Sequence, residues 1–186
     1  MSANSSHPAI PTGLRKVMQG SRVSLSLADF TQPDCPLVAV NDRFCDLSGY
    51  GQDEVLGRNC RFLQPTGGAG PVRDRMRAFL KDADQKDGKF LIPNIRRNGK
   101  RFLNLVYMSK LYRGGQVALV LGSQFSVQPD DRRKTDVYDA ALLEDLQVMK
   151  DILGETAMVL LGSYESLASS HSIIAQARLE GIDGED

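Results

Sequence analysis

The alternation of apolar and polar residues predicts two strands in the first quarter of the chain. Val23, Leu25 and Leu27 alternate with polar residues, which is the period-two pattern of a half-buried strand. An apolar run at 37–40 predicts a second strand, and the turn sequence at 33–36 separates the two. Two adjacent strands joined by a short turn are expected to pair in one sheet.

Helical spacing and capping residues predict short helices around these strands. A helix is expected at 12–19, where Gly20 ends it, and a second within 41–49. One further turn of helix is expected at 53–56, and a longer helix at about 71–85, which begins with a favourable proline. These helices separate the first two strands from the remainder of the predicted sheet.

Three more strands are predicted at 89–97, 101–112 and 116–127. Asn98-Gly99 and Gly114-Gly115 lie between them, and such pairs are typical of two-residue hairpin turns. The resulting order is two strands, several helices and then three strands. This order predicts an antiparallel α+β fold with a five-stranded sheet.

The last third of the chain carries two apolar stripes at helical spacing. The stripe predicted for a helix at 135–153 consists of Tyr138, Leu142, Leu146, Met149 and Leu153. The stripe predicted for a helix at 155–180 consists of Leu160, Tyr164, Leu167, His171 and Ile174. Neither helix can bury its stripe alone, so we expect a helical hairpin that packs on the domain or on a second subunit. The chain is thus divided into an N-terminal segment with a short cap helix (1–22), one domain (23–128) and a helical extension (129–186).

Composition restricts the class of protein. No run of about 18 apolar residues is present and the N-terminus lacks a signal-peptide pattern, so we expect a cytoplasmic protein without a membrane span. Three irregularly spaced cysteines favour a reducing compartment. Residues 1–135 carry 21 basic and 12 acidic side chains, whereas residues 136–186 carry 2 and 11. An acidic tail is unsuited to phosphate backbones, and the basic residues at 96–101 are expected to form a solvated hairpin tip, so no nucleic-acid partner is predicted.

The candidate chemistry is concentrated at 57–64, which reads GRNCRFLQ. On a helical turn Cys60 shares a face with Leu63 and Gln64, while Arg61 lies about 100° further round and can reach an anionic group. A thiol beside amides and a guanidinium suits a pocket for a phosphorylated aromatic cofactor. By itself, however, a single buried cysteine is more often an inert apolar side chain.

GRNCRFLQ resembles the signature of the LOV family, the blue-light-sensing branch of the PAS domains, and the resemblance extends over about 23–128. It implies a PAS/LOV fold in which an antiparallel sheet and short helices enclose a flavin. It also implies that Cys60 is the nucleophile that bonds reversibly to the flavin C4a carbon after light absorption, while the ring N5 takes a proton. Asn94, Gly99 and Asn104 match the family spacing further along the chain.

The resemblance implies a cofactor-binding role for a set of polar residues. Arg61 and Arg77 are expected near the flavin phosphate, with Arg73 as a further candidate. The motif amides Asn59 and Gln64 are expected to contact the ribityl chain and the ring edge. The strand residues Asn94 and Asn104 are expected at the polar edge of the ring. Gln124 is expected beside N5, as a switch. The apolar walls are expected to be Leu63, Leu80, Val106 and Met108, for which ordinary core packing explains the pattern equally well.

The predicted function is therefore a blue-light photoreceptor, not an enzyme, that signals through altered oligomerisation or partner binding of its helical extensions. FMN is the expected cofactor, FAD remains an alternative, and no metal site is expected. A homodimer formed through the extensions, sensitive to light, is the predicted assembly, and the downstream protein partner is unknown. The alternative is a light-insensitive flavin-binding PAS module that acts as a constitutive protein-interaction adaptor.

Overall fold

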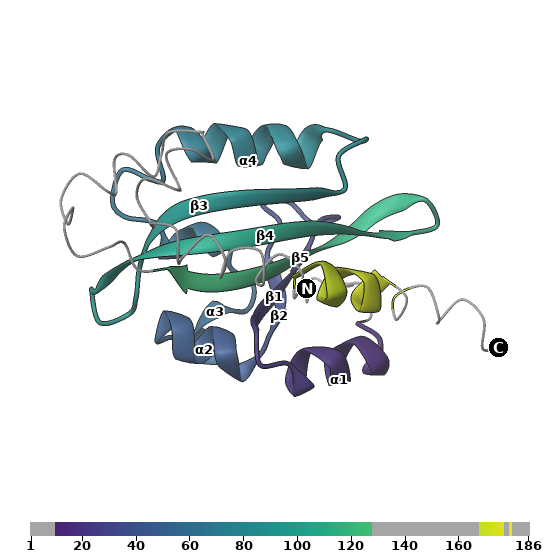
Figure 1. The fold of residues 1–186 in the computed structure, drawn as a ribbon, viewed down its shortest axis with the longest axis horizontal. Coiled ribbons are helices and arrows are strands. Elements are labelled where there is room, and N and C mark those ends of the chain that lie inside the picture. Colours follow the sequence, from purple (N-terminus) through teal and green to yellow (C-terminus); the bar gives the residue numbers. More distant parts are fainter. Residues whose placement is uncertain (1–9, 128–167, 177–178, 180–186) are drawn as a thin grey trace, which may run out of the picture.

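The structure, a computed structural model, describes residues 10–127, 168–176 and 179. As predicted, its centre is a five-stranded antiparallel sheet, and the strands lie in the order β2-β1-β5-β4-β3 (Figure 1). The strands are β1 (Ser24–Asp29), β2 (Leu37–Val40), β3 (Asp87–Ile95), β4 (Arg101–Arg113) and β5 (Gln116–Val127). Because β5 pairs with β1, the last strand of the domain lies in the middle of the sheet.

Helices cover the sheet on both faces. They are α1 (Thr12–Gly20), α2 (Asp42–Ser48), α3 (Gln52–Val55), the 3₁₀ helix η1 (Cys60–Leu63), α4 (Pro71–Lys81) and a C-terminal helix at 168–176. In Figure 1, α4 runs along β3, while α1 and the C-terminal helix lie close together at the other side of the molecule. The predicted helix at 71–85 ends earlier, at Lys81, and the residues after it lead into β3.

The period-two alternation of the strands separates two apolar clusters. Odd-numbered residues of β1 and β5, such as Leu25 and Leu121, pack with Leu14 of α1 and with Leu179, which is also helical. Even-numbered residues of β3 and β4 face the other way, toward α4. We call the first face the outer face and the second the inner face. Strand β4 contributes to both clusters, with Leu111 on the outer face and Val106 on the inner face, so a shift of its register by one residue would exchange them.

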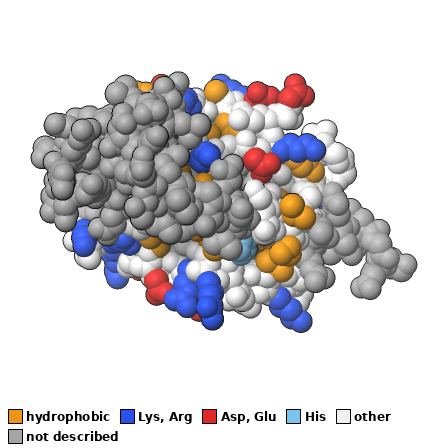
Figure 2. Space-filling model, viewed as in Figure 1, with side chains coloured by type: hydrophobic (Ala, Val, Ile, Leu, Met, Phe, Trp, Pro, Cys, Tyr) orange, Lys and Arg blue, Asp and Glu red, His pale blue; other side chains and the backbone are white. Residues whose placement is uncertain are grey.

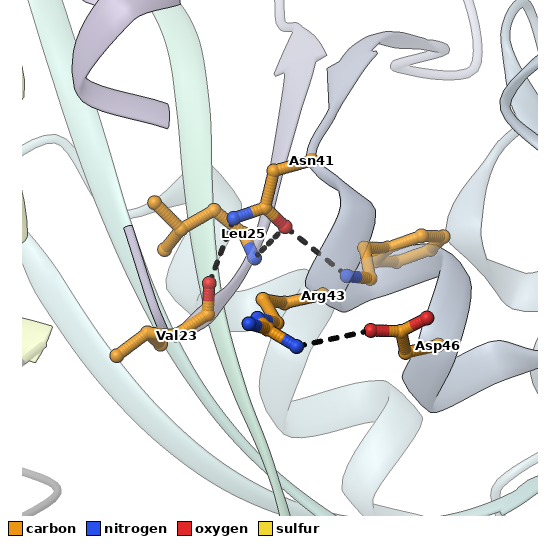
Figure 3. A network of polar contacts seen from close by, with 6 residues as sticks. Val23, Leu25, Asn41, Arg43 and Asp46 are labelled. Atoms are coloured by element: carbon orange, nitrogen blue, oxygen red, sulfur yellow. Dashed lines mark hydrogen bonds and ion pairs between the residues drawn. The ribbon is translucent and has the colours of Figure 1, made fainter. Parts of the chain in front are cut away.

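Buried Asn41 connects α1, β1 and α2 (Figure 3). Its Oδ1 caps α2 by accepting from Phe44 N at 3.1 Å, and it also accepts from Leu25 N at 2.9 Å. Its Nδ2 donates to Val23 O at 2.8 Å and to Met18 O at 3.0 Å. All the bonding capacity of this amide is therefore used on four backbone groups of three different segments.

Lys110 holds the C-terminal end of α4 against the sheet. Its ammonium group is buried and donates to the carbonyl oxygens of Phe79 at 2.7 Å and Gln85 at 2.9 Å, and to that of Asp82. A helix leaves its last carbonyls without intrahelical partners, and a cation there also interacts favourably with the helix dipole. This interaction ends α4 and fixes its position over β4.

The basic hairpin at 96–101 is exposed from 97 onward, as predicted for a solvated tip, but Arg96 is partly buried. The Arg96 guanidinium donates to the carbonyl oxygen of Leu47 and to Ser126 Oγ at 3.3 Å, and its central carbon lies 4.3 Å from the centre of the Phe102 ring. Arg97 pairs with Glu54 at 2.8 Å. The two arginines therefore attach the β3–β4 turn to the α2–α3 region, which the sequence pattern does not reveal.

The C-terminal helix is attached to the outer face by polar and apolar contacts. His171 Nε2 lies 2.7 Å from Ser21 Oγ, and Gln176 exchanges two hydrogen bonds with the backbone of Tyr112, at 2.9 and 3.0 Å. Its buried residues are Ala168 and Ala175, whereas Ile174 is 45% exposed and Ile173 is 71% exposed. Ile174, a member of the predicted stripe, is thus not buried against the domain, where the helix packs its alanines instead. The remaining predicted tail stripes lie outside the described residues.

Replacement of Asn41 by alanine is expected to destabilise the protein by roughly 2–4 kcal/mol, because four hydrogen bonds of the buried amide to the backbone are lost. For a domain of this size the midpoint of thermal unfolding should fall by about 5–10 °C. The control is Arg43→Ala, which removes the exposed 3.3 Å pair with Asp46 and should cost about 0.5 kcal/mol or less. Equal melting temperatures for the two variants would show that Asn41 does not have this role.

Candidate functional site

A cavity of about 170 Å³ lies between the inner face of the sheet, η1 and α4. One water molecule needs only about 10–15 Å³ on this measure, so the space suits a sizeable ligand. Every predicted site residue lines it: Asn59, Cys60, Arg61, Leu63, Gln64, Arg77, Leu80, Asn94, Asn104, Val106, Met108 and Gln124. The sequence analysis did not assign the following lining residues to the site, Arg73 being only a further candidate: Ser26, Ala28, Cys35, Leu37, Arg73, Met76, Ile92, Val120 and Gly122.

Local backbone interactions present Cys60 to the cavity. Gly57, at φ +77°, donates to Leu37 O at 2.8 Å, and Leu37 N donates to Arg58 O at 2.9 Å, so the segment before η1 is attached to β2. Asn59 then caps η1 by accepting from Arg61 N at 3.0 Å. The first residue of the short helix, Cys60, is therefore held in a defined position.

Four polar side chains form a continuous hydrogen-bonded chain across the inner face. Asn104 Nδ2 donates to Asn94 Oδ1 at 2.9 Å and to Gln124 Oε1 at 3.0 Å. Gln124 Nε2 in turn donates to Ser26 Oγ at 2.9 Å. The four residues come from β3, β4, β5 and β1, which are neighbours in the sheet. We call this set the amide chain.

One atom of the amide chain has no partner. Asn104 is 1% exposed, and its Oδ1 makes no hydrogen bond although it is buried. A buried acceptor without a partner is costly and uncommon in native proteins. Because Asn104 also lines the cavity, this oxygen is suited to accept from a ligand N–H group.

Comparison with known proteins identifies the family. Residues 26–127 match the model of a family described as PAS domain. The chain is 35% identical over 122 residues to blue-light-activated histidine kinase 1 of Erythrobacter litoralis, covering 63% of this chain and 33% of that protein. One similar solved structure is a LOV protein of Rhodobacter sphaeroides, with 28% identity and a TM-score of 0.60, covering 89% of this chain and 94% of that one. Another is an RNA-binding light-oxygen-voltage receptor, with 35% identity and a TM-score of 0.57, covering 68% of this chain and 37% of that one.

The chain belongs to the LOV branch of the PAS domain family. It spans only about a third of the length of the histidine kinase and of the RNA-binding receptor. The similarity to the kinase therefore concerns the LOV domain and not the kinase as a whole. The expected fold and family are confirmed.

Burial determines the protonation state of the LOV thiol. The pKa of Cys60 is raised to about 12, mainly by burial and further by neighbouring Cys35, while a hydrogen bond from Ser26 opposes the shift. Burial and the charges of Asp29 and Asp34 raise the pKa of Cys35 to about 11. At neutral pH Cys60 is therefore a neutral thiol, which carries its own proton.

Three arginines of the LOV domain line the cavity where it meets solvent. Arg61 makes a two-pronged ion pair with Asp34, at 2.6 and 2.8 Å, so Asp34 is the anionic neighbour that its position predicted. Arg77 lies 3.5 Å from Asp74, and Arg73 lies 4.0 Å from the same carboxylate. All these side chains are about half exposed or more, and such pairs contribute at most about 1 kcal/mol. A phosphate group can therefore compete for the guanidinium groups.

Ser26 is a member of the amide chain that sequence reasoning missed. It belongs to the polar half of an alternating strand, which ordinarily indicates the solvent face. In the LOV fold both faces of β1 are covered, so Ser24 and Ser26 are buried. The observation that would have indicated burial of Ser26 is that β1 lies between two other strands. This position is known only once β5 is known to pair with β1.

The described part of the LOV chain contains neither a membrane-spanning helix nor a metal-binding cluster. No helix among residues 10–127 and 168–176 is long and apolar enough to cross a membrane. Within the same described residues, no three side chains of His, Cys, Asp or Glu are placed to bind a metal ion.

The pKa of Cys60 predicts very slow alkylation in the dark. At pH 8 a thiol with a pKa near 12 is about 10⁻⁴ ionised, so iodoacetamide should modify Cys60 on the order of 10³-fold more slowly than a free cysteine. The rate should rise with pH until the pH approaches 12, since only the thiolate reacts. Peptide mass spectrometry would measure modification at this residue, and the urea-unfolded chain is the control. Equal rates at pH 8 in the folded and unfolded chains would contradict the assigned protonation state.

Proposed function

We propose that this protein is a blue-light photoreceptor in which the cavity binds a flavin and Cys60 is the photoactive nucleophile. The observation that carries the proposal is the position of the Cys60 thiol in one cavity with the amide chain. The membership in the LOV family supports light sensing, because several relatives are named as blue-light receptors. We propose a sensory and not an enzymatic role for this domain.

The residues present fit a flavin. The ring system carries a polar edge with N–H and C=O groups, and Asn94, Asn104 and Gln124 offer amides on one side of the cavity. The N–H of that edge would supply the donor that buried Asn104 Oδ1 lacks. Apolar walls suit the remainder of the ring, and they are formed by Leu63, Leu80, Ile92, Val106 and Met108.

A terminal phosphate would lie at the open side of the cavity, within reach of Arg61, Arg73 and Arg77. Guanidinium groups match phosphate oxygens in geometry and charge. Three arginines that face one opening favour FMN, whose phosphate is terminal, over riboflavin, which has none. FMN is accordingly the proposed cofactor, and FAD is the alternative, with its adenylate outside the cavity.

When bound, a flavin would supply light absorption and an electrophilic C4a carbon, and Cys60 would provide the sulfur that bonds to this carbon and the proton for ring N5. The protein provides the position and the protonation state of the thiol. A neutral Cys60 brings both the sulfur and the proton that this addition requires, so no external acid is needed. Gln124 is proposed to respond to the new N5 proton by reorienting its amide.

The first experiment is an absorption spectrum of the purified protein before and after blue light. We expect the visible flavin band to bleach and then recover in the dark. Cys60→Ala should bind flavin and show no such bleaching, because the bonding sulfur is absent. Cys45→Ala is the matched control, since Cys45 does not line the cavity, and it should behave as the wild type. A flavin band that is unaffected by light in the wild type would exclude the photoreceptor and support the alternative, a light-insensitive flavin-binding adaptor.

We further propose that the output is a change in self-association through the helical extensions. The large apolar side chains that are exposed among the described residues, Ile173 and Ile174, both lie on the C-terminal helix. Figure 2 shows hydrophobic side chains gathered over this helix. A second copy of the chain is the proposed partner, in a cytoplasmic protein. The RNA-binding receptor among the similar structures does not fit the predicted absence of a nucleic-acid partner, which stays a prediction.

Light scattering after size exclusion tests this assembly. For the wild type we expect a dimer of the 20.4 kDa chain whose stability differs between dark and light. Ile173→Glu should weaken the dimer, because a charge would be buried in an apolar contact. Lys100→Glu, at the exposed β3–β4 turn, is the control for the change of charge. A wild-type monomer under both light conditions would exclude this output.

A further inference from the structure

Ser26 has a position in the cavity that none of the roles above explains. It lies on β1 and is 5% exposed, and its Oγ accepts from Gln124 Nε2 at 2.9 Å. It also lines the same cavity as Cys60. Ser26 therefore lies at the end of the amide chain, in the same cavity as the thiol.

The neighbouring strand leaves space for this hydroxyl. Ser26 pairs with Gly122 of β5, and a Cβ at Gly122 would lie 2.7 Å from Ser26 Oγ. That separation is shorter than any normal contact, so a side chain at this position would displace the hydroxyl. The absence of a side chain at Gly122 is thus a requirement for the observed position of Ser26.

The hydrogen-bond inventory of Ser26 leaves its own hydrogen for another acceptor. A hydroxyl has two acceptor lone pairs and one donor hydrogen, and Gln124 uses only a lone pair. The sulfur of Cys60 lines the same cavity and is the acceptor available to this hydrogen, and the Ser26 side chain lowers the pKa of the thiol against the effect of burial. A hydroxyl that accepts from an amide is also a somewhat stronger donor.

We propose that Ser26 is a positioning residue of the light cycle, which holds the Cys60 sulfur and the Gln124 amide on one hydroxyl and accelerates the dark recovery. This inference rests on the proposed function. In the dark step the carbon–sulfur bond breaks, its electron pair leaves with the sulfur, and the sulfur regains the proton from the ring nitrogen. No external oxidant or reductant is required. The Ser26 hydroxyl stabilises the negative charge that develops on the leaving sulfur.

The same geometry couples the sulfur to the switch glutamine. While Gln124 donates its N–H, Ser26 can donate to the sulfur. If the amide turns over, its oxygen faces Ser26 and becomes a competing acceptor for the single hydroxyl hydrogen. The orientation of Gln124 therefore determines whether the sulfur keeps its hydrogen bond.

Recovery kinetics and dark alkylation test the proposal together. Ser26→Ala should slow the dark recovery of the absorption band about tenfold, and slow alkylation of Cys60 by iodoacetamide in the dark by a similar factor, equivalent to one pKa unit. Ser26→Thr keeps the hydroxyl and should restore both rates to near the wild-type values. Ser24→Ala is the matched control, since Ser24 lies two residues away on the same strand, is also buried and does not line the cavity.

A second variant covers the case in which Ser26→Ala does not fold. Gly122→Ala retains the serine but displaces its hydroxyl, and it should slow both rates in the same direction. Rates within twofold of the wild type in Ser26→Ala and Gly122→Ala would overturn the role of Ser26 while leaving the photoreceptor intact. A wild-type chain that does not bleach at all would instead refute the proposed function, and this role with it.

Discussion

The interaction on which the site depends is the amide chain across the inner face of the sheet. Amides buried in an apolar cavity are costly unless they find partners, and here each of the four strands involved supplies one member. The hydrogen bonds require the observed strand order, because Ser26 and Gln124 meet only when β1 pairs with β5. The amide chain thus links the formation of the sheet directly to the formation of the cavity.

Other contacts of the fold position the two walls of the cavity around the amide chain. Asn41 joins α1, β1 and α2, and the backbone bonds at Gly57 and Leu37 attach the η1 segment to β2. On the opposite side Lys110 fixes the end of α4 over β4. The thiol and the arginines are therefore carried by short elements that are each attached to the sheet by polar contacts.

The alternation along β5 provides a physical route from the site to the helical extensions. Gln124 faces the cavity, whereas the next residue, Phe125, faces the outer cluster that contains Leu14, Ala175 and Leu179. A reorientation of the Gln124 amide that moves the β5 backbone would therefore change the packing of the helices on the outer face. Interior packing is dense, so a small displacement of one strand is transmitted to the residues that cover it.

The sequence by itself determined the elements and the chemistry of the pocket. Period-two alternation, the turn at Asn98-Gly99 and the cap at Asn41 identify local structure, since each depends on residues that are close along the chain. The GRNCRFLQ motif and the spacing of Asn94 and Asn104 identified residues that line one cavity. These features could be read because the resemblance covers most of the domain.

Only the tertiary structure decided features that depend on residues far apart in the sequence. Ser26 became a site residue because β5, about a hundred residues later, covers one edge of β1 and places Gln124 beside it. Arg96 became an anchor rather than a solvated tip, and Ile174 became exposed because the C-terminal helix buries its alanines instead. In each case the side chain's role is set by its neighbours in space, and a pattern of apolar spacing contains no information about them.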